Sequence, residues 1–331
     1  MAKAFLAILF GSLMWYLAPP DAYHKNDYVL DVLVDLGMEP PAHYSAMLDT
    51  QLVKMGEDLI FLGKTDRYKG YSGFISKFYN CTSCHNTVRE RPDLSKIDVT
   101  EKLDYAVANN LAMLQGSSFY GVANMESWYN DDYYLKYGDL VKPANKSLSE
   151  SIQLCAQECA QGRKLKAWEL EAIKAYLQSI SYRLSDLNLS ISEWDKLNEQ
   201  ALSAQDKIKL LKSKYMQKNP ATFGDIPASK ATGYEGITGN PEKGALIYKY
   251  ACQSCHLEEG ESDVLLDMNP LTFKWLEKNI TKNSPGSFYE IIRKGTYSES
   301  GHREYMPNFT KEKLSNQQIE DLRAFIEKMA K

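Results

Sequence analysis

The sequence has no apolar run long enough to cross a membrane as a helix, no excess of positive charge and little cysteine. Its longest apolar run, residues 4–17, falls short of the ~20 residues that a spanning helix needs. A formal net charge of −4 argues against nucleic-acid binding, which requires concentrated positive charge. The hydrophobic fraction of 44% and the charged fraction of 25% are typical of a soluble globular protein, and 331 residues suffice for two ordinary domains.

The N-terminal residues match an export signal. Lys3 provides a positive start, and the apolar run that follows ends at residues 18–20, Ala-Pro-Pro. This pattern predicts a cleaved signal peptide over residues 1–22 and a periplasmic location. An uncleaved signal that acts as a membrane anchor is the alternative, whereas the absence of a cysteine after the run argues against a lipoprotein.

Four of the six cysteines belong to two copies of one pattern, C-x-x-C-H, at residues 81–85 and 252–256. This is the attachment signature of a c-type haem, in which both thiols form thioethers and the histidine binds iron. A four-cysteine zinc site is the alternative, but zinc does not require a histidine after both pairs. We therefore predict two covalently bound haem c groups, and export fits this prediction because c-type attachment takes place outside the cytosol. The predicted attachment residues are Cys81, Cys84, Cys252 and Cys255, and the predicted proximal ligands are His85 and His256.

The elements around each motif predict a mostly α-helical protein of two cytochrome c-type domains. Such a domain has a helix before the motif and a closing helix that packs on it. For the first domain, residues 45–183, the apolar pattern predicts these helices around 51–62 and over 168–180. For the second domain, residues 235–331, a Pro-containing helix start at 240–244 and an apolar stripe after Ser315 predict the same pair.

The segment between the two domains, residues 184–234, is predicted to be a helical linker and loop. Apolar residues recur at helical spacing over 192–218, which predicts one amphipathic helix lying on a domain surface. The Gly-, Pro- and Thr-containing stretch 219–240 predicts a loop.

The distal ligand of the second haem is predicted to be Met306. It precedes Pro307 and lies just before the closing helix, where the distal Met of a small cytochrome c belongs. A thioether ligand raises the reduction potential, as suits an electron-transfer haem. His302, four residues earlier, is the alternative ligand.

The first domain has no Met-Pro at the corresponding place, and its distal ligand is open. Met113 and Met125 lie in the long insertion after the motif, whereas Cys155 and Cys159 occupy the position just before the closing helix. In an oxidising compartment, two leftover cysteines suggest a disulfide. Cysteines four residues apart in a helix, however, place their Cβ atoms about 5–6 Å apart, beyond the ~3.5–4.5 Å of a disulfide. A thiolate ligand to the first haem is the other interpretation.

Residues 152–155, Ile-Gln-Leu-Cys, followed by Gly162 and a closing helix, resemble the I-N-x-C…N-G segment of the di-haem thiosulfate dehydrogenases and the related SoxA cytochromes. The resemblance covers residues 50–182. It implies that Cys155 is the distal ligand of an active-site haem, and that the chain oxidises thiosulfate or a similar sulfur compound. Cys159 differs from the serine often found there. Three arginines are candidate contacts for a sulfur oxyanion substrate: Arg163, Arg89 and Arg91.

Two other functions fit the same motifs. One is a non-catalytic electron carrier with both haems bound by His and Met, in which Met125 or Met113 serves the first haem. The other is a peroxidase-like protein with an open haem. Each function requires a redox partner protein as electron acceptor or donor.

Overall fold

The computed structural model describes residues 22–66, 72–199, 202–282, 286–296 and 306–331. Nearly all of the predicted signal peptide lies outside these residues. The described part of the chain is mostly helical, and its β-structure is limited to three isolated bridges. This agrees with the predicted mostly α-helical class.

Fourteen α-helices of different lengths follow one another along the described chain. Two five-residue π-helical turns interrupt them, η4 (Cys155–Cys159) and η6 (Tyr248–Cys252). The helices are α1 (Val29–Asp35), α2 (Thr50–Leu62), α3 (Val99–Asn109), α4 (Tyr133–Tyr137), α5 (Val141–Lys146), α6 (Leu148–Leu154), α7 (Ala167–Ser179), α8 (Ile191–Asn198), α9 (Ala204–Lys212), α10 (Pro241–Ile247), α11 (Gln253–His256), α12 (Pro270–Ile280), α13 (Phe288–Lys294) and α14 (Asn316–Met329).

Each C-x-x-C-H motif is preceded by a helix that packs on a closing helix, as predicted. α2 crosses α7, and α10 crosses α14. Glycine permits both crossings: a Cβ on Gly56 would lie 2.0 Å from the carbonyl oxygen of Ala172, and one on Gly244 would lie 2.0 Å from that of Asp321. The capping box predicted for the last helix is also present, because Ser315 Oγ accepts from Gln318 N.

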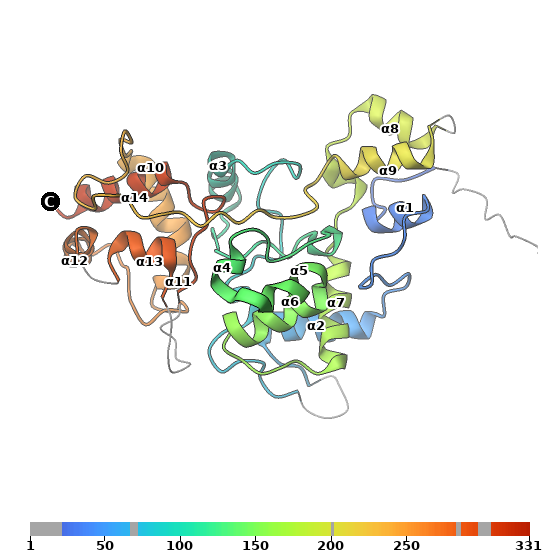
Figure 1. Cartoon of the computed structure of the whole chain (residues 1–331), viewed down its shortest axis with the longest axis horizontal. Helices are drawn as coiled ribbons and strands as arrows, with labels where there is room; N and C mark the ends of the chain where they lie inside the picture. The colour runs from blue at the N-terminus through green and yellow to red at the C-terminus, as the bar shows by residue number, and fades with distance from the viewer. Residues whose placement is uncertain (1–21, 67–71, 200–201, 283–285, 297–305) are drawn as a thin grey trace, which may run out of the picture.

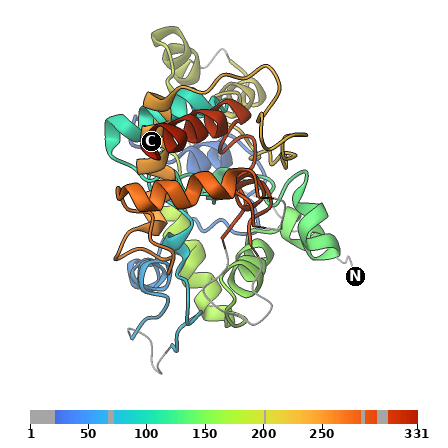
Figure 2. The same ribbon diagram turned by 90° about the vertical axis from the view of Figure 1, so that its left-hand side faces the viewer.

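Four groups of buried apolar side chains support these helices in the described residues, and the smallest of them lies between α5 and α6. The first core gathers around α2, α6 and α7, and the second core around α10, α12, α13 and α14. The third core joins α1 to α8, α9 and the turn at 184–187. Figure 1 shows the corresponding groups of helices side by side, and Figure 2 turns the group around the second core toward the viewer.

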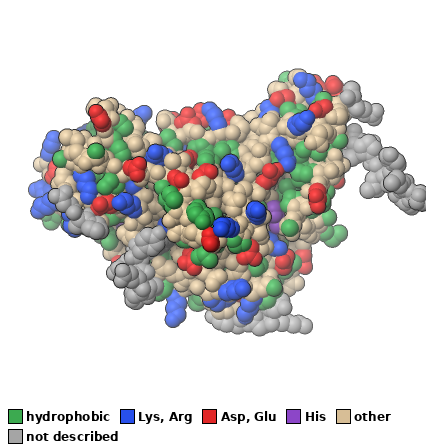
Figure 3. Space-filling model, viewed as in Figure 1, with side chains coloured by type: hydrophobic (Ala, Val, Ile, Leu, Met, Phe, Trp, Pro, Cys, Tyr) green, Lys and Arg blue, Asp and Glu red, His purple; other side chains and the backbone are tan. Residues whose placement is uncertain are grey.

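No helix among the described residues is long and apolar enough to cross a membrane. On the face shown in Figure 3, basic and acidic side chains are intermixed, without a large patch of either sign. This distribution agrees with the near-balance of charges in the sequence.

The predicted single helix over 192–218 is wrong, because two shorter helices, α8 and α9, occupy this segment. Glu199 has an extended conformation and ends α8, and Ser203 starts α9 by accepting a hydrogen bond from Asp206 N. The apolar stripe is confirmed in part, because Ala204, which belongs to it, is exposed. Leu197, Ile208 and Leu211 are buried in the third core against α1.

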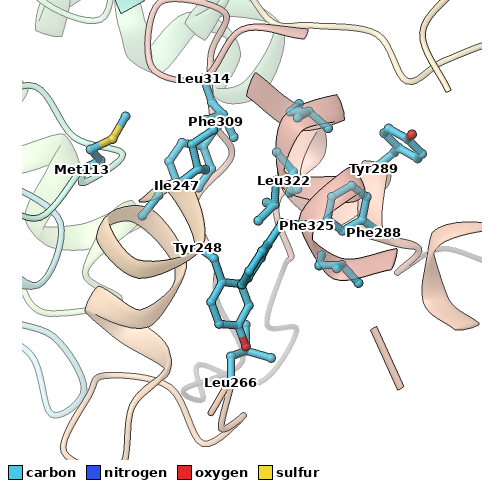
Figure 4. Close-up of a cluster of buried hydrophobic side chains, with 14 of the residues drawn as sticks. Met113, Ile247, Tyr248, Leu266, Phe288, Tyr289, Phe309, Leu314, Leu322 and Phe325 are labelled. Atoms are coloured by element: carbon cyan, nitrogen blue, oxygen red, sulfur yellow. The ribbon is translucent and has the colours of Figure 1, made fainter. Parts of the chain in front are cut away.

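α3 lies in the sequence of the first predicted domain but packs against the second core. Leu103 and Ala106 belong to that core, and so does Met113, which is only 2% exposed. Figure 4 shows Met113 on the same side of the cluster as Ile247, and its backbone N–H donates to Tyr250 O at 2.7 Å. The predicted domain boundaries stay a prediction. Residues from both predicted domains, however, contribute to the second core.

Candidate functional site

The first motif lies in a short turn, η1 (Cys81–Ser83), directly beside α2. The Asn80 side chain caps this turn by accepting from Ser83 N at 2.9 Å, and its amide donates to Phe61 O at 2.9 Å. These bonds fix the turn to the end of α2, so Cys81 and Cys84 both face the cavity beside it.

A hydrogen bond and an aromatic contact fix the orientation of the His85 ring. Its Nδ1 donates to Ser117 O at 2.6 Å, which leaves Nε2 available for a metal. The ring stacks on Phe119, with centroids 4.3 Å apart. Gly116 admits the ring, because a Cβ there would lie 2.5 Å from it. Burial lowers the pKa of His85 to about 4, so the imidazole is neutral, as iron ligation requires.

The two thiols and His85 open into one cavity with mostly apolar walls, which fits a covalently attached porphyrin. The lining of this cavity also includes the second cysteine pair, Cys155 and Cys159. The apolar wall includes Leu59, Ile60, Ile75, Val122, Trp128, Leu148, Ile173 and Leu177.

Cys155 and Cys159 are free thiols, so the disulfide interpretation is wrong for this structure. They begin and end the π-helical turn η4, in which Ala160 N donates to Cys155 O at 2.8 Å. Such turns are frequent at functional sites.

The two thiols differ in acidity. The pKa of Cys155 is raised by its hydrogen bond to Cys159 and by burial. The hydrogen bond from Cys155, assisted by Tyr137 and Tyr129, outweighs burial and lowers the pKa of Cys159 to about 6. The Tyr137 and Tyr129 hydroxyls lie 3.3 and 3.6 Å from Cys159 Sγ. The two thiols share one hydrogen bond, and their pKa values are shifted in opposite directions.

The methionines considered for the first haem lie elsewhere. Met125 is 4% exposed and packs in the third core near Tyr182, and Met113 packs in the second core. Neither lines the cavity of the first motif. Besides Cys81 and Cys84, the described residues that line this cavity thus include two further cysteines, Cys155 and Cys159, and no methionine.

The second motif repeats the histidine geometry of the first. It follows α10 through the turn η6, and His256 Nδ1 donates to Val264 O at 2.8 Å, which again leaves Nε2 available. Burial lowers the pKa of His256. Gln253 Nε2 donates to Leu266 O at 3.0 Å and ties the motif to the following loop.

Met306 packs against the second core and is half-buried. Its backbone N–H donates to Thr296 Oγ1 at 2.7 Å, and its carbonyl accepts from Thr296 N at 2.9 Å. Arg293, 1% exposed, donates to Phe309 O and Leu314 O and so holds the loop that follows. The alternative ligand, His302, lies outside the described residues.

The three candidate arginines do not line the cavity of the first motif. Arg163 binds the fully buried Glu169 at 2.6 Å and also donates to Gly73 O and Phe74 O. It therefore fixes the start of α7. Arg89 and Arg91 donate to nearby backbone carbonyls and line a neighbouring hollow.

Lys136, a cation that lines this cavity, was not predicted from the sequence. Lys136 Nζ donates to Asn308 Oδ1 at 2.9 Å, and its positive charge helps lower the pKa of Cys159. Its place in a tyrosine-rich insertion gave no usable signal, because Asn308 lies far along the chain.

A second missed feature is a buried ion cluster between the two halves of the chain. Glu90 lies 3.1 Å from Lys102 on α3 and 3.5 Å from Lys313, which precedes α14. Burial raises the pKa of Glu90, but attraction to both lysines outweighs it and lowers the value to about 2. Burial is the main cause that lowers the pKa of Lys313 to about 7, although Glu90 opposes it.

Glu90→Gln is expected to destabilise the protein in a pH-dependent way. Because its folded-state pKa of about 2 lies below the ordinary 4.5, the carboxylate stabilises the fold above pH 4.5, and this contribution is lost as pH falls toward 2. The loss should reach about 3 kcal/mol at neutral pH and disappear in acid. Denaturant unfolding over a pH series measures it. Glu101→Gln on the exposed pair with Lys96 is the control; identical pH profiles for the two variants would contradict this account.

The two motifs lie close together. Ser83 Oγ, inside the first motif, donates to Glu261 Oε1 at 2.8 Å, and Glu261 belongs to the loop after the second motif. Cys84 and Cys255 are near enough to interact electrostatically. No group of three or more His, Cys, Asp and Glu side chains in the described residues is arranged to hold a single metal ion, as a four-cysteine zinc site would require.

These features define the C-terminal part of the chain as a c-type cytochrome domain with the cysteines for one haem c. Residues 239–326 match the family described as cytochrome C oxidase, cbb3-type, subunit III. No curated protein and no solved structure shows a significant match to the chain. A cytochrome c domain transfers electrons, which implies a redox partner protein.

Proposed function

We propose that the chain is a di-haem c-type cytochrome that oxidises thiosulfate, or a similar small sulfur compound, at its first haem. Electrons then leave through the second haem. One observation carries this proposal: Cys155 and Cys159 line the same cavity as Cys81, Cys84 and His85. The family resemblance at residues 152–155 supports the choice of substrate class.

In this proposal, Cys81 and Cys84 hold the first haem, and His85 is its proximal ligand. The orientation of His85 by Ser117 O supports this role. Cys155 or Cys159 would supply a thiolate to the iron, and a thiolate lowers the reduction potential of haem iron. When bound, the haem supplies a one-electron acceptor at the cysteine side of the cavity.

Lys136 is the substrate-side cation of this proposal. It lines the cavity close to Cys159, and burial lowers its pKa. While protonated, a half-buried ammonium attracts a small anion more strongly than a surface lysine does, because less water screens it. Lys136 thus takes the role that the sequence had suggested for Arg163. The hydroxyls of Tyr129 and Tyr137 add hydrogen-bond donors on the same side.

The second haem is the electron exit. His256 and Met306 would bind its iron, and a thioether ligand would raise its potential above that of a thiolate-bound haem. With both haems bound, this order of potentials would favour electron transfer from the first haem to the second, and the closeness of Cys84 to Cys255 supports this path. An external redox protein takes them up.

The proposed location is the periplasm, with residues 1–22 acting as an export signal. Thioether attachment outside the cytosol supports it.

Thiosulfate turnover by cysteine variants tests the proposed function. Alanine at the ligand position, either Cys155→Ala or Cys159→Ala, is expected to lower turnover about 100-fold or more while two covalent haems remain. Ser151→Ala, on the same cavity wall, is the control. If the double cysteine variant keeps full turnover, the proposed site is wrong. If the native protein has no turnover but exchanges electrons rapidly, the non-catalytic carrier is favoured.

A further inference from the structure

Lys313 reaches from the C-terminal domain into the proximal side of the first motif. Its Nζ donates to Gly116 O at 2.6 Å, although the two residues are 197 positions apart. Its side chain is 12% exposed and lines the cavity of the first motif. We propose that Lys313 is a positioning residue that orients His85 and raises the reduction potential of the first haem. This inference rests on the proposed haem at Cys81 and Cys84.

A short chain of bonds connects Lys313 to the proximal histidine. Gly116, whose carbonyl Lys313 binds, donates its own N–H to Cys84 O at 2.9 Å. The next residue, Ser117, accepts the hydrogen bond from His85 Nδ1 at 2.6 Å. One peptide unit thus separates the lysine from the carbonyl that orients the imidazole. A hydrogen-bond partner of a metal-bound histidine tunes both ring orientation and ligand basicity.

The positive charge of Lys313 is a second reason to expect a higher reduction potential of the first haem. Lys313, Lys102 and Glu90 form a cluster with a net charge of +1 when all three are ionised, and their side chains are only 9–12% exposed. Burial reduces screening by water, so this charge would interact with the iron of a haem bound at His85 more strongly than a surface charge would. A positive charge stabilises the ferrous form, which has one electron more than the ferric form.

The same segment also carries the proposed distal ligand of the second haem. It begins at Met306, lines the first cavity at Pro307, Asn308 and Thr310, and ends at Lys313 before α14. Backbone bonds fix its end, because Lys313 N donates to Thr310 O at 3.1 Å. Docking of the C-terminal domain therefore sets the properties of the haem held by the N-terminal half.

Potentiometric titration of each haem in the intact protein tests this inference. Lys313→Met is expected to lower the potential of the first haem, so that its reduced-to-oxidised ratio at a fixed potential falls about tenfold, which is 59 mV. Lys313→Arg should leave the potential of the first haem nearly unchanged, because arginine keeps the positive charge. Glu90→Gln should raise that potential, because it removes a negative charge. The titration is made at pH 5, well below the pKa of about 7 of Lys313, because removal of Glu90 lowers that pKa further.

Lys311→Met is the matched control, because Lys311 is exposed and two residues away. It should leave both potentials unchanged, and the second haem should be little affected in every variant. If Lys313→Met fails to fold, the opposite shift in Glu90→Gln still decides the matter. Two covalent haems with an unchanged first potential in Lys313→Met, or in Glu90→Gln, would overturn this inference alone. A native protein with a single covalent haem would overturn it together with the proposed function.

Discussion

Gly56→Val and Gly244→Val are each expected to destabilise the protein by about 3 kcal/mol or more. The reason is steric: the Cβ positions lie 2.0 Å from backbone carbonyl oxygens of the opposing helices, α7 and α14. Backbone atoms cannot move aside as a flexible side chain does, so each helix pair must separate and lose buried contacts on both sides. Denaturant unfolding of the holoprotein, followed by helical circular dichroism, measures the loss.

Gly37→Ala is the control for the two valine variants. Gly37 has φ +94°, but a Cβ there meets nothing within 4 Å, so only backbone strain of about 1 kcal/mol is expected. A loss at Gly56 or Gly244 no larger than at Gly37 would show that these helices do not cross as closely as described.

Arg293→Met is expected to cost about 3 kcal/mol and to disturb Met306. The arginine is 1% exposed, and its guanidinium donates to Phe309 O, Leu314 O and Asn316 Oδ1. Methionine fills similar space but leaves these buried acceptors without a donor. The loop after Met306 should loosen, which weakens the proposed Met–iron bond.

Thermal unfolding and the charge-transfer absorption of a Met-ligated ferric haem measure the two effects of Arg293→Met. Lys294→Met, at the exposed neighbouring position, should change neither. An Arg293→Met protein with native stability and native absorption would show that the loop does not depend on the arginine.

The local parts of the fold were predictable from the sequence. Helix pairs around each motif follow from apolar periodicity, and the start of α14 follows from the Ser315–Gln318 box, because both signals lie within a few residues. The prediction of a single linker helix failed at residue 199. There the backbone becomes extended, and Ser203 then caps a new helix, although the apolar spacing in the sequence continues. Periodicity reports the buried face but not a break between two helices that share it.

The site was predictable only in part, for a similar reason. The C-x-x-C-H motifs can be recognised from the sequence alone. The position of Cys155 just before the closing helix also indicated that it lies near the first motif. Spacing could not exclude Met125 or Met113, because only tertiary packing shows that they belong to other cores. Lys313 reaches Gly116 across 197 positions, and no local pattern announces such a contact.

The central claim is that a cysteine sulfur binds the first haem, and low-temperature EPR of the oxidised holoprotein tests it most directly. We expect a low-spin signal with the narrow g-spread of His/thiolate ligation beside a His/Met signal. The narrow signal should disappear when the ligating cysteine, Cys155 or Cys159, is replaced by alanine, and Ser151→Ala should leave it unchanged. Two His/Met signals that survive replacement of both cysteines would contradict the claim and leave a di-haem electron carrier.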